Sequence, residues 1–240
     1  MKAKVRRIPV GPLGANCYLV WDDEAPAARS GERPCLVIDP GAEGGRILGL
    51  LAKDGLRPEI IAATHCHGDH IAAVDELLAA FPDADWAVGA PEAEWPARPA
   101  LNLSYGFGLP MQVRPPKRLL RDGDELVVGC ELRVVGGTDP QSATRDSQLS
   151  LRCLAVPGHS PGSIAYYCAA AGAVFTGDAL FAGDIGRADL PGGDERQLVE
   201  AIRAKILTLP AETVVWPGHA NRSRVGAEKK NNPYVRLSGD

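Results

Sequence analysis

Residues 64–70 read Thr-His-Cys-His-Gly-Asp-His and hold three of the five histidines of the chain. Imidazole, thiolate and carboxylate groups are the ligands with which proteins hold zinc and related metals. Side chains alternate between two sides of an extended segment, so His65 and His67 are predicted to face one ion together. Cys66 would then point away and pack beside the site. This segment therefore predicts a metal site.

Asp69 stands where a helix is expected to begin. Apolar residues recur at helical spacing over residues 71–81, and aspartate is a preferred N-cap residue. The cap would turn the chain, so that Asp69 and His70 face a second position beside the first. A solvated loop ending in a capped helix would explain Asp69, but it would leave three closely spaced histidines without a role.

The two remaining histidines each follow a short apolar run. His159 lies in Pro-Gly-His-Ser and His219 lies in Trp-Pro-Gly-His. The runs predict buried strands, so both histidines are expected on loops at strand ends. A third run, residues 173–175, leads into Thr-Gly-Asp and puts Asp178 in a comparable position. An aspartate after a glycine is usually a turn residue, but here it joins other strand-end ligands.

The number of ligands exceeds what one ion needs. A catalytic zinc usually takes about three protein ligands and keeps one position open for water. Five histidines with Asp69 and Asp178 supply seven, which indicates two ions. Water between two cations loses a proton near neutral pH and becomes a nucleophile, while a cation polarises the carbonyl under attack. No serine nucleophile is required, so Ser160 and Ser163 are expected to be turn and strand residues.

Composition limits the class of substrate. A formal net charge of -4, without a long basic run, argues against nucleic acid as a partner. No segment is apolar enough to cross a membrane, and no apolar stretch follows the basic N-terminus, so we expect a soluble, cytoplasmic protein. Six cysteines without a C-x-x-C pair are expected to be reduced. No linker divides the chain, and we expect one domain over residues 1–240.

Strands and helices must position these ligands. We predict strands over residues 5–9, 16–21, 35–39, 60–64, 86–88, 125–128, 132–135, 149–156, 163–168, 173–175 and 213–216. We predict helices over residues 43–52, 71–81 and 195–207, an irregular Pro-rich region over 91–117 and a polar hairpin loop over 136–146. Such a mixture does not by itself dictate an architecture.

Further motifs follow in order along the chain. They are Gly-Ala-Asn-Cys-Tyr at residues 14–18, Pro-Gly-His-Ser-Pro-Gly at 157–162, Phe-Thr-Gly-Asp-Ala-Leu-Phe-Ala-Gly at 175–183, Ile-Gly-Arg-Ala-Asp-Leu-Pro-Gly-Gly at 185–193, Pro-Gly-His at 217–219 and Asn-Pro at 232–233. Together with the histidine segment they resemble the metallo-β-lactamase superfamily, and within it the glyoxalase II-like hydrolases. The resemblance implies an α/β fold in which two packed sheets lie between helices, an αββα sandwich with a metal site at one edge.

The resemblance also implies how the ligands divide between two divalent ions. One ion would be held by His65, His67 and His159, the other by Asp69, His70 and His219, with Asp178 as a bridge. We expect zinc, and iron or manganese would be compatible, because these ligands do not select sharply among them. Asp69 and Asp178 are the expected catalytic residues, beside a metal-bound hydroxide as nucleophile.

A small acyl compound is the expected substrate. A thiolate leaves without a general acid, and the chain has no spare histidine to act as one, which favours a thioester such as a hydroxyacylglutathione. Lactones and other esters are alternatives. The chain ends soon after His219, so we expect no helical C-terminal domain, as in short glyoxalase II-like proteins. Those relatives carry Gly-Pro and Thr-Thr after this histidine, where this chain reads Ala-Asn-Arg-Ser-Arg.

Basic side chains near these motifs could contact a substrate carboxylate. We expect four of them to form a solvated basic tail instead: Arg222, Arg224, Lys229 and Lys230. Arg187 is expected to pair with Asp189 rather than anchor the substrate. The sequence leaves these substrate contacts and the oligomeric state open.

Two other functions compete with hydrolysis. A persulfide dioxygenase-like enzyme shares the Thr-His-Cys-His-x-Asp-His pattern and would use one iron, held by His65, His159 and Asp178. A non-catalytic metal-binding or scaffold protein would not need all seven ligand positions filled. Metal counting and oxygen uptake separate the oxygenase from the hydrolase.

Overall fold

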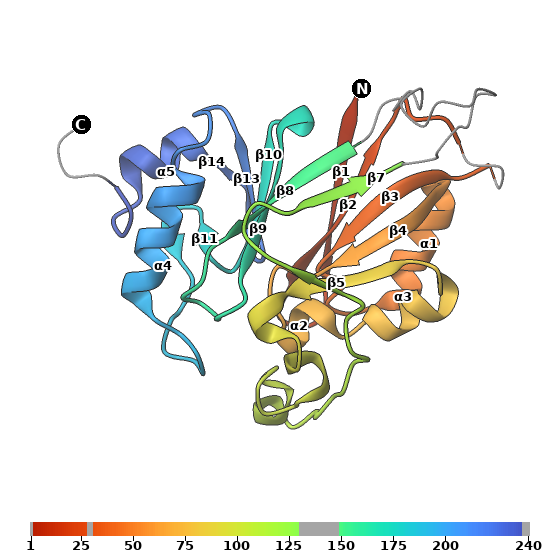
Figure 1. Cartoon of the computed structure of the whole chain (residues 1–240), viewed down its shortest axis with the longest axis horizontal. Coiled ribbons are helices and arrows are strands. Elements are labelled where there is room, and N and C mark those ends of the chain that lie inside the picture. Colours follow the sequence, from red (N-terminus) through yellow and green to blue (C-terminus); the bar gives the residue numbers. More distant parts are fainter. Residues whose placement is uncertain (1, 28–30, 130–148, 237–240) are drawn as a thin grey trace, which may run out of the picture.

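A computed structural model of the chain describes residues 2–27, 31–129 and 149–236. Within these residues, two six-stranded β-sheets pack against each other, and helices lie on the outer side of each sheet (Figure 1). The αββα sandwich that the sequence predicts is therefore confirmed. No helix in the described part of the chain is long and apolar enough to cross a membrane.

The first sheet comes from the N-terminal half of the chain. Its strands, in spatial order, are β1 (Ala3–Val10), β2 (Ala15–Asp22), β3 (Arg33–Ile38), β4 (Leu56–Ala62), β5 (Asp85–Gly89) and β6 (Arg118–Leu120). β1 to β3 pair antiparallel, and β3 to β6 pair parallel. Its helices are α1 (Gly44–Asp54), α2 (Gly68–Ile71) and α3 (Val74–Ala80), followed by the short 3-10 helices η1 (Ala90–Glu92), η2 (Trp95–Ala97) and η3 (Ser104–Phe107).

The second sheet comes from the C-terminal half. Its strands, in spatial order, are β14 (Ser223–Arg224), β13 (Val214–Pro217), β10 (Ala173–Gly177), β9 (Ile164–Cys168), β8 (Leu149–Ala155) and β7 (Glu125–Val128). Only β10 and β13 pair parallel among these described strands. The remaining elements are η4 (Ala169–Ala171), the hairpin of β11 (Leu180–Phe181) and β12 (Asp184–Ile185), α4 (Glu195–Ala201), which continues as the π-helical turn η5 (Ile202–Ile206), and α5 (Val225–Asn231).

Successive side chains of the central strands point to opposite faces of the sheet, so one set packs against the helices and the other packs between the two sheets. In β2, Cys17 and Leu19 pack toward the helices of the first half, whereas Tyr18 and Val20 pack between the sheets. In β10, Phe175 likewise faces the space between the sheets. Both faces of these strands are buried, which explains why they read as continuous apolar runs rather than as alternating ones.

Most predicted elements are present, with shifted ends. β4 begins at Leu56 and ends at Ala62, so the predicted strand over residues 60–64 is displaced toward its C-terminus. The predicted helix over 71–81 is two helices, α2 and α3, and the helix over 195–207 ends in π-helical geometry. The sequence missed β6, β11, β12, β14 and α5, most of which are short. The predicted strand at 132–135 and the loop at 136–146 lie outside the described residues.

Phe175 lets us test the packing between the sheets. Its side chain is fully buried and its ring centroid lies 5.1 Å from that of Tyr18. We expect Phe175→Ala to lower the free energy of unfolding by about 3–5 kcal/mol, because it leaves a cavity between two sheets that cannot collapse freely. Denaturant titration measures the change. The control Leu119→Ala, at a side chain 44% exposed, should cost less than about 1 kcal/mol.

Candidate metal centre

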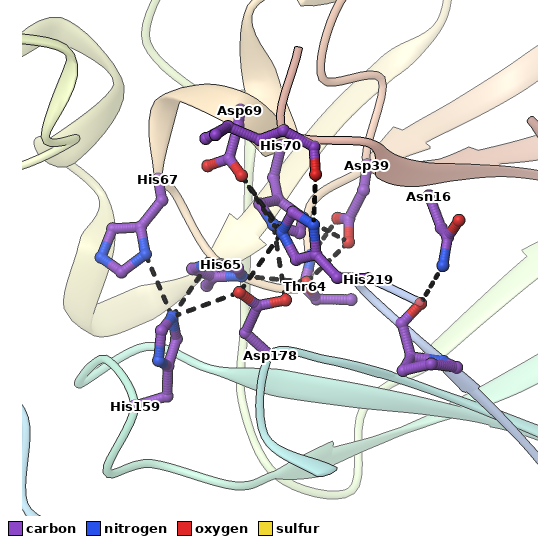
Figure 2. Close-up of polar contacts among 12 residues, drawn as sticks. Asn16, Asp39, Thr64, His65, His67, Asp69, His70, His159, Asp178 and His219 are labelled. Carbon is purple, nitrogen blue, oxygen red and sulfur yellow. Dashed lines mark hydrogen bonds and ion pairs between the residues drawn. The ribbon is translucent and has the colours of Figure 1, made fainter. Parts of the chain in front are cut away.

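The structure brings all seven predicted ligands together at one edge of the sandwich, where strands of both sheets end (Figure 2). The segment after β4 and the helix α2 supply four of them from the first half of the chain. The second half supplies one ligand after β8, one after β10 and one after β13. The donors form overlapping groups whose atoms lie within 4.8 Å of one another: His65, His67 and His159; His65, His70 and Asp178; Asp69, His70 and His219.

The first group consists of three buried imidazoles. His159 Nε2 lies 3.2 Å from His65 Nε2 and 3.1 Å from His67 Nδ1. All three rings are almost completely buried. The inward-facing nitrogens thus surround one point between the two sheets.

The second group combines imidazole and carboxylate. His219 Nε2 lies 3.2 Å from Asp69 Oδ2 and 3.3 Å from His70 Nε2. Asp178 lies between the groups, with Oδ1 3.5 Å from His70 Nε2 and Oδ2 3.9 Å from His159 Nε2. A bridging carboxylate would occupy such a position.

Backbone carbonyls orient two of the rings. His159 Nδ1 donates to the carbonyl oxygen of Arg187 at 2.8 Å, and His219 Nδ1 donates to that of Leu13 at 3.1 Å. A carbonyl oxygen can only accept, so Nδ1 must carry the proton in both rings. In the neutral imidazole, Nε2 then holds a lone pair that points into the centre.

Asp39, which the sequence analysis missed, orients two more rings. Its Oδ2 accepts from Thr64 Oγ1 at 2.7 Å and lies 3.0 Å from His70 Nδ1. The Thr64 hydroxyl donates its hydrogen to Asp39, so its oxygen accepts a hydrogen bond from His65 Nδ1 at 3.1 Å. Asp39 follows β3 in Ile-Asp-Pro-Gly and has a left-handed backbone with φ 51°. A carboxylate at a strand end was the signal that could have identified it.

The donor set fits a cation. In the first group, lone pairs of buried nitrogens that face each other at 3.1 to 3.2 Å repel unless a positive charge lies between them. In addition, Asp178 Oδ1 is buried without a hydrogen-bond partner among the described residues. Buried polar atoms without partners are rare in folded proteins and often mark an ion or water site. The outer ring nitrogens of His65, His70, His159 and His219 are hydrogen-bonded, as is usual for metal-binding histidines, whereas that of His67, Nε2, has no partner among the described residues.

The two groups differ in electrostatics. Burial lowers the pKa of His67 to about 3 and that of His65 well below its usual value, so both rings are neutral at pH 7. Burial also acts to lower the pKa of His70, but the charges of Asp69, Asp178 and Asp39 outweigh it and raise that pKa to about 10. The pKa of His219 is raised as well, against the effect of burial, by its hydrogen bond to Asp69 and by the charge of Asp178.

Glu92 connects two of the ligand loops, and the sequence analysis missed it too. Its buried carboxylate accepts from the backbone N–H of Cys66 at 2.6 Å and from that of Gly162 at 2.8 Å. Burial raises the pKa of this carboxyl. Cys66 itself is fully buried in the core beneath the first sheet and belongs to none of the donor groups found in the described residues.

Hydrogen bonds from β2 hold the loop that carries His219. Asn16 Nδ2 and the Tyr18 hydroxyl both donate to the carbonyl oxygen of Pro217, at 2.9 and 2.6 Å. Gly218 has to be glycine here, because a Cβ atom would lie 2.1 Å from Asp178 Oδ1. The Pro-Gly-His motif is therefore a consequence of close packing at the centre.

The predicted N-cap role of Asp69 is wrong. α2 begins at Gly68 with His67 as its N-cap residue, and no side chain caps it. The backbone N–H of Gly68 donates to the carbonyl oxygen of Asn102, and that of His70 donates to the carbonyl oxygen of His67. The N-cap position thus lies two residues earlier than predicted, and the Asp69 carboxylate is directed at His219 (Figure 2).

A cavity of about 630 Å³, the main cavity, opens over the centre. Arg187 lines it and forms the predicted ion pair with Asp189, through two contacts of 2.8 Å. The four residues of the expected basic tail are exposed to solvent, and three of them lie in a strand or a helix. Arg224 ends β14 and donates to the carbonyl oxygen of Glu212, while Lys229 and Lys230 lie exposed in α5, and Arg222 stacks 5.2 Å from the Trp216 ring. None of these four residues lines the main cavity.

Asp178 is the ligand whose role is easiest to test. Asp178→Asn keeps the shape of the side chain but removes a negative charge from the middle of the centre. We expect metal affinity to fall by more than about a hundredfold while the protein stays folded. Elemental analysis and circular dichroism measure the two effects. Cys66→Ala is the control and should retain its metal; a Cys66→Ala protein without metal would contradict the assignment of the donors.

The pKa shifts predict that the two groups bind metal with different pH dependence. A raised pKa means that protons compete with metal at His70 and His219 at neutral pH, whereas His65 and His67 are already neutral there. Between about pH 8 and pH 6, metal should be lost first from the group of Asp69, His70 and His219. Metal content after dialysis at several pH values measures this. Simultaneous loss of all metal would contradict this prediction. The variant His219→Ala lacks a ligand of that group, so its metal content should change little with pH in this range.

Known proteins resemble this chain over almost its full length. A probable metallo-hydrolase of Bacillus subtilis, YqgX, is 36% identical, with 97% of each chain covered. The hydroxyacylglutathione hydrolase GloC of Haemophilus influenzae is 32% identical, covering 95% of this chain and 96% of the relative. The crystal structure of TTHA1623 in a di-iron-bound form superposes with a TM-score of 0.73 at 33% identity, covering 96% of this chain and all of the other.

The family model of the metallo-β-lactamase superfamily matches residues 10–219, a range that contains all seven candidate ligands. The fold, the match to the family model and the full-length relatives agree, and the chain belongs to the metallo-β-lactamase superfamily.

Proposed function

We propose that the chain is a thioester hydrolase that holds two divalent ions. The first ion would bind to His65, His67 and His159 and the second to Asp69, His70 and His219, with Asp178 between them. One observation carries the proposal, namely that three imidazoles turn nitrogens toward one another at 3.1 to 3.2 Å, beside a second group of imidazole and carboxylate donors. The di-iron form of TTHA1623 supports the number of ions.

Two ions in these positions would acidify a water molecule and polarise the carbonyl group of the substrate. The protein's own residues supply orientation and charge. Asp39 and the carbonyl oxygens of Leu13 and Arg187 hold the rings so that their lone pairs face inward. Asp69 and Asp178 offset the positive charge of the ions and are the proposed catalytic carboxylates. We propose zinc as the metal, with iron or manganese compatible with the same donors.

The lining of the main cavity supports a thioester. Apart from the ligands, its described residues include one charged side chain, Arg187, which is already paired with Asp189, and no lysine, cysteine or glutamate. Tyr105 is then the one candidate general acid in this lining apart from the ligands and Arg187, and a thiolate departs without needing one. The name of the relative GloC points to a thioester of glutathione. Lactones and other esters are the second class we propose to test.

Further parts of the proposal concern the surroundings of the enzyme. We propose a small-molecule substrate, with neither nucleic acid nor a membrane as partner. The cysteines at positions 17, 35, 66, 153 and 168 are buried and unpaired, which supports a reducing, cytoplasmic location. The proposed single domain spans residues 1–240.

Metal counting with an activity panel tests the proposed function. Metal-replete protein should contain about two transition-metal ions per chain, hydrolyse thioesters without oxygen uptake, and lose activity when a chelator removes the metal. Elemental analysis, a thiol-release assay and an oxygen electrode provide the measurements. One iron per chain at saturation, together with oxygen consumption, would contradict the hydrolase function and indicate a mononuclear iron oxygenase.

A further inference from the structure

A second cavity adjoins the metal centre. This side cavity has a volume of about 380 Å³ and shares Leu13 and Asp69 with the main cavity as common wall. Both volumes lie in the range typical of small-molecule sites. The walls of the side cavity come from the turn between β1 and β2, the loop after β3, α2 and the segment that follows Asn102: Val10, Gly11, Pro12, Leu13, Gly41, Ala42, Gly68, Asp69, Ala72, Ser104, Leu109 and Met111.

The lining of the side cavity offers almost nothing to a polar ligand. It contains no lysine, arginine or histidine among the described residues, and Asp69 is its one ionisable group. The Ser104 hydroxyl is already engaged, because it donates to Asn102 Oδ1 at 2.6 Å and accepts from the backbone N–H of Met111 at 3.0 Å. An anionic group would be repelled by Asp69, and a hydrogen-bonding group would lose its water without gaining a partner.

Small and apolar residues make the space. Apart from Asp69, the residues that line it from the loop after β3 and from α2 with its C-cap are glycines and alanines: Gly41, Ala42, Gly68 and Ala72. Leu13 and Leu109 line it as well, although they are 50% and 73% exposed to solvent. Large exposed apolar side chains gathered around a cavity are typical of a binding site for an apolar ligand.

The junction of the two cavities determines which part of a substrate would enter each one. A carbonyl group under attack must lie at the centre, where Asp69 forms the common wall, so the two halves of the substrate diverge from there. The main cavity is larger and carries the guanidinium of Arg187. It suits the bulkier, polar leaving group. The smaller cavity, without a cation, suits the other half of the molecule.

We propose that the side cavity binds the uncharged, apolar acyl chain of the substrate, which makes the enzyme selective for medium-length acyl thioesters over acetyl thioesters. This inference rests on the proposed thioester hydrolase function. It adds a specificity site built from the turn after β1, the helix α2 and the segment around Leu109.

The test compares acyl chains on one thiol. Metal-replete, full-length protein is given acetyl, butyryl, hexanoyl and octanoyl thioesters of N-acetylcysteamine, and kcat/KM is measured for each. We expect the hexanoyl-to-acetyl ratio of kcat/KM to be at least about tenfold, because added methylenes leave water for an apolar cavity. A ratio near one, with acetyl hydrolysed, would overturn the side cavity as an acyl site and leave the hydrolase function intact. Absence of any thioester hydrolysis would instead overturn the proposed function.

Variants connect the ratio to the cavity. Ala72→Leu fills the cavity from an exposed position at the end of α2 and should reduce the ratio by about tenfold. Ala79→Leu is the matched control, because Ala79 is exposed on α3 and lines neither cavity; it should leave the ratio unchanged. Circular dichroism and metal content confirm that both variants fold.

A second variant and a second substrate series complete the test. Leu109→Ala removes apolar surface from the side cavity without touching the core and should reduce the ratio by about threefold. In the second series the acyl group stays acetyl and the thiol is lengthened. If Ala72→Leu changes how kcat/KM depends on the length of the thiol and not on the length of the acyl chain, the leaving group occupies the side cavity and the proposal is wrong.

Discussion

The rest of this structure depends on one constraint: several histidine side chains must turn ring nitrogens toward one another at a buried metal centre. The imidazole nitrogens of His65, His67 and His159 approach to 3.1 to 3.2 Å and repel one another, and a hydrogen bond on the outer side of a ring helps to hold it in place. Asp39, Thr64 and two backbone carbonyls provide such bonds for four of the five rings, and His67 lacks one among the described residues. Glu92 adds a connection between the ligand loops. The centre therefore depends on more residues than its seven ligands. Asp39 and Glu92 are buried beside it although neither is a candidate ligand, because they hold the ligands and their loops in place.

The sandwich is the scaffold that this arrangement requires. Four donors come from the first half of the chain and three from the second, so the centre exists only while the two sheets are packed together. Tyr18 serves both purposes, because its ring packs between the sheets against Phe175 and its hydroxyl donates to the carbonyl oxygen of Pro217 beside the His219 loop. Packing between the sheets and geometry at the centre are consequently coupled, and damage to one is transmitted to the other through short, buried contacts.

The charges of the metal centre are distributed unevenly between its two donor groups, and the two cavities beside it also differ in polarity. The side with His65 and His67 consists of neutral rings, whereas the side with Asp69 and His70 concentrates carboxylates. Asp69 stands at the point where the main and side cavities meet. A substrate that spans both would have its reacting carbonyl beside this carboxylate, a polar leaving group toward Arg187 and an apolar group in the side cavity. Selectivity would then come from the shape and polarity of the cavities, and the reaction itself from the centre.

The sequence by itself determined the candidate ligands and the fold class, because the ligands stand in short motifs next to apolar runs and the order of motifs resembles one superfamily. Periodicity also located most long strands, since both of their faces are buried. Only the tertiary structure decided what depends on contacts between distant segments. The roles of Asp39 and Glu92 arise from partners 25 to 70 residues away. The start of α2, which the sequence placed at Asp69, is influenced by the carbonyl oxygen of Asn102, and the two cavities are walled by segments that no local pattern connects. Local propensity carries no information about such partners, because the free energy of a buried hydrogen bond or a shared cavity exists only once the chain has folded around it.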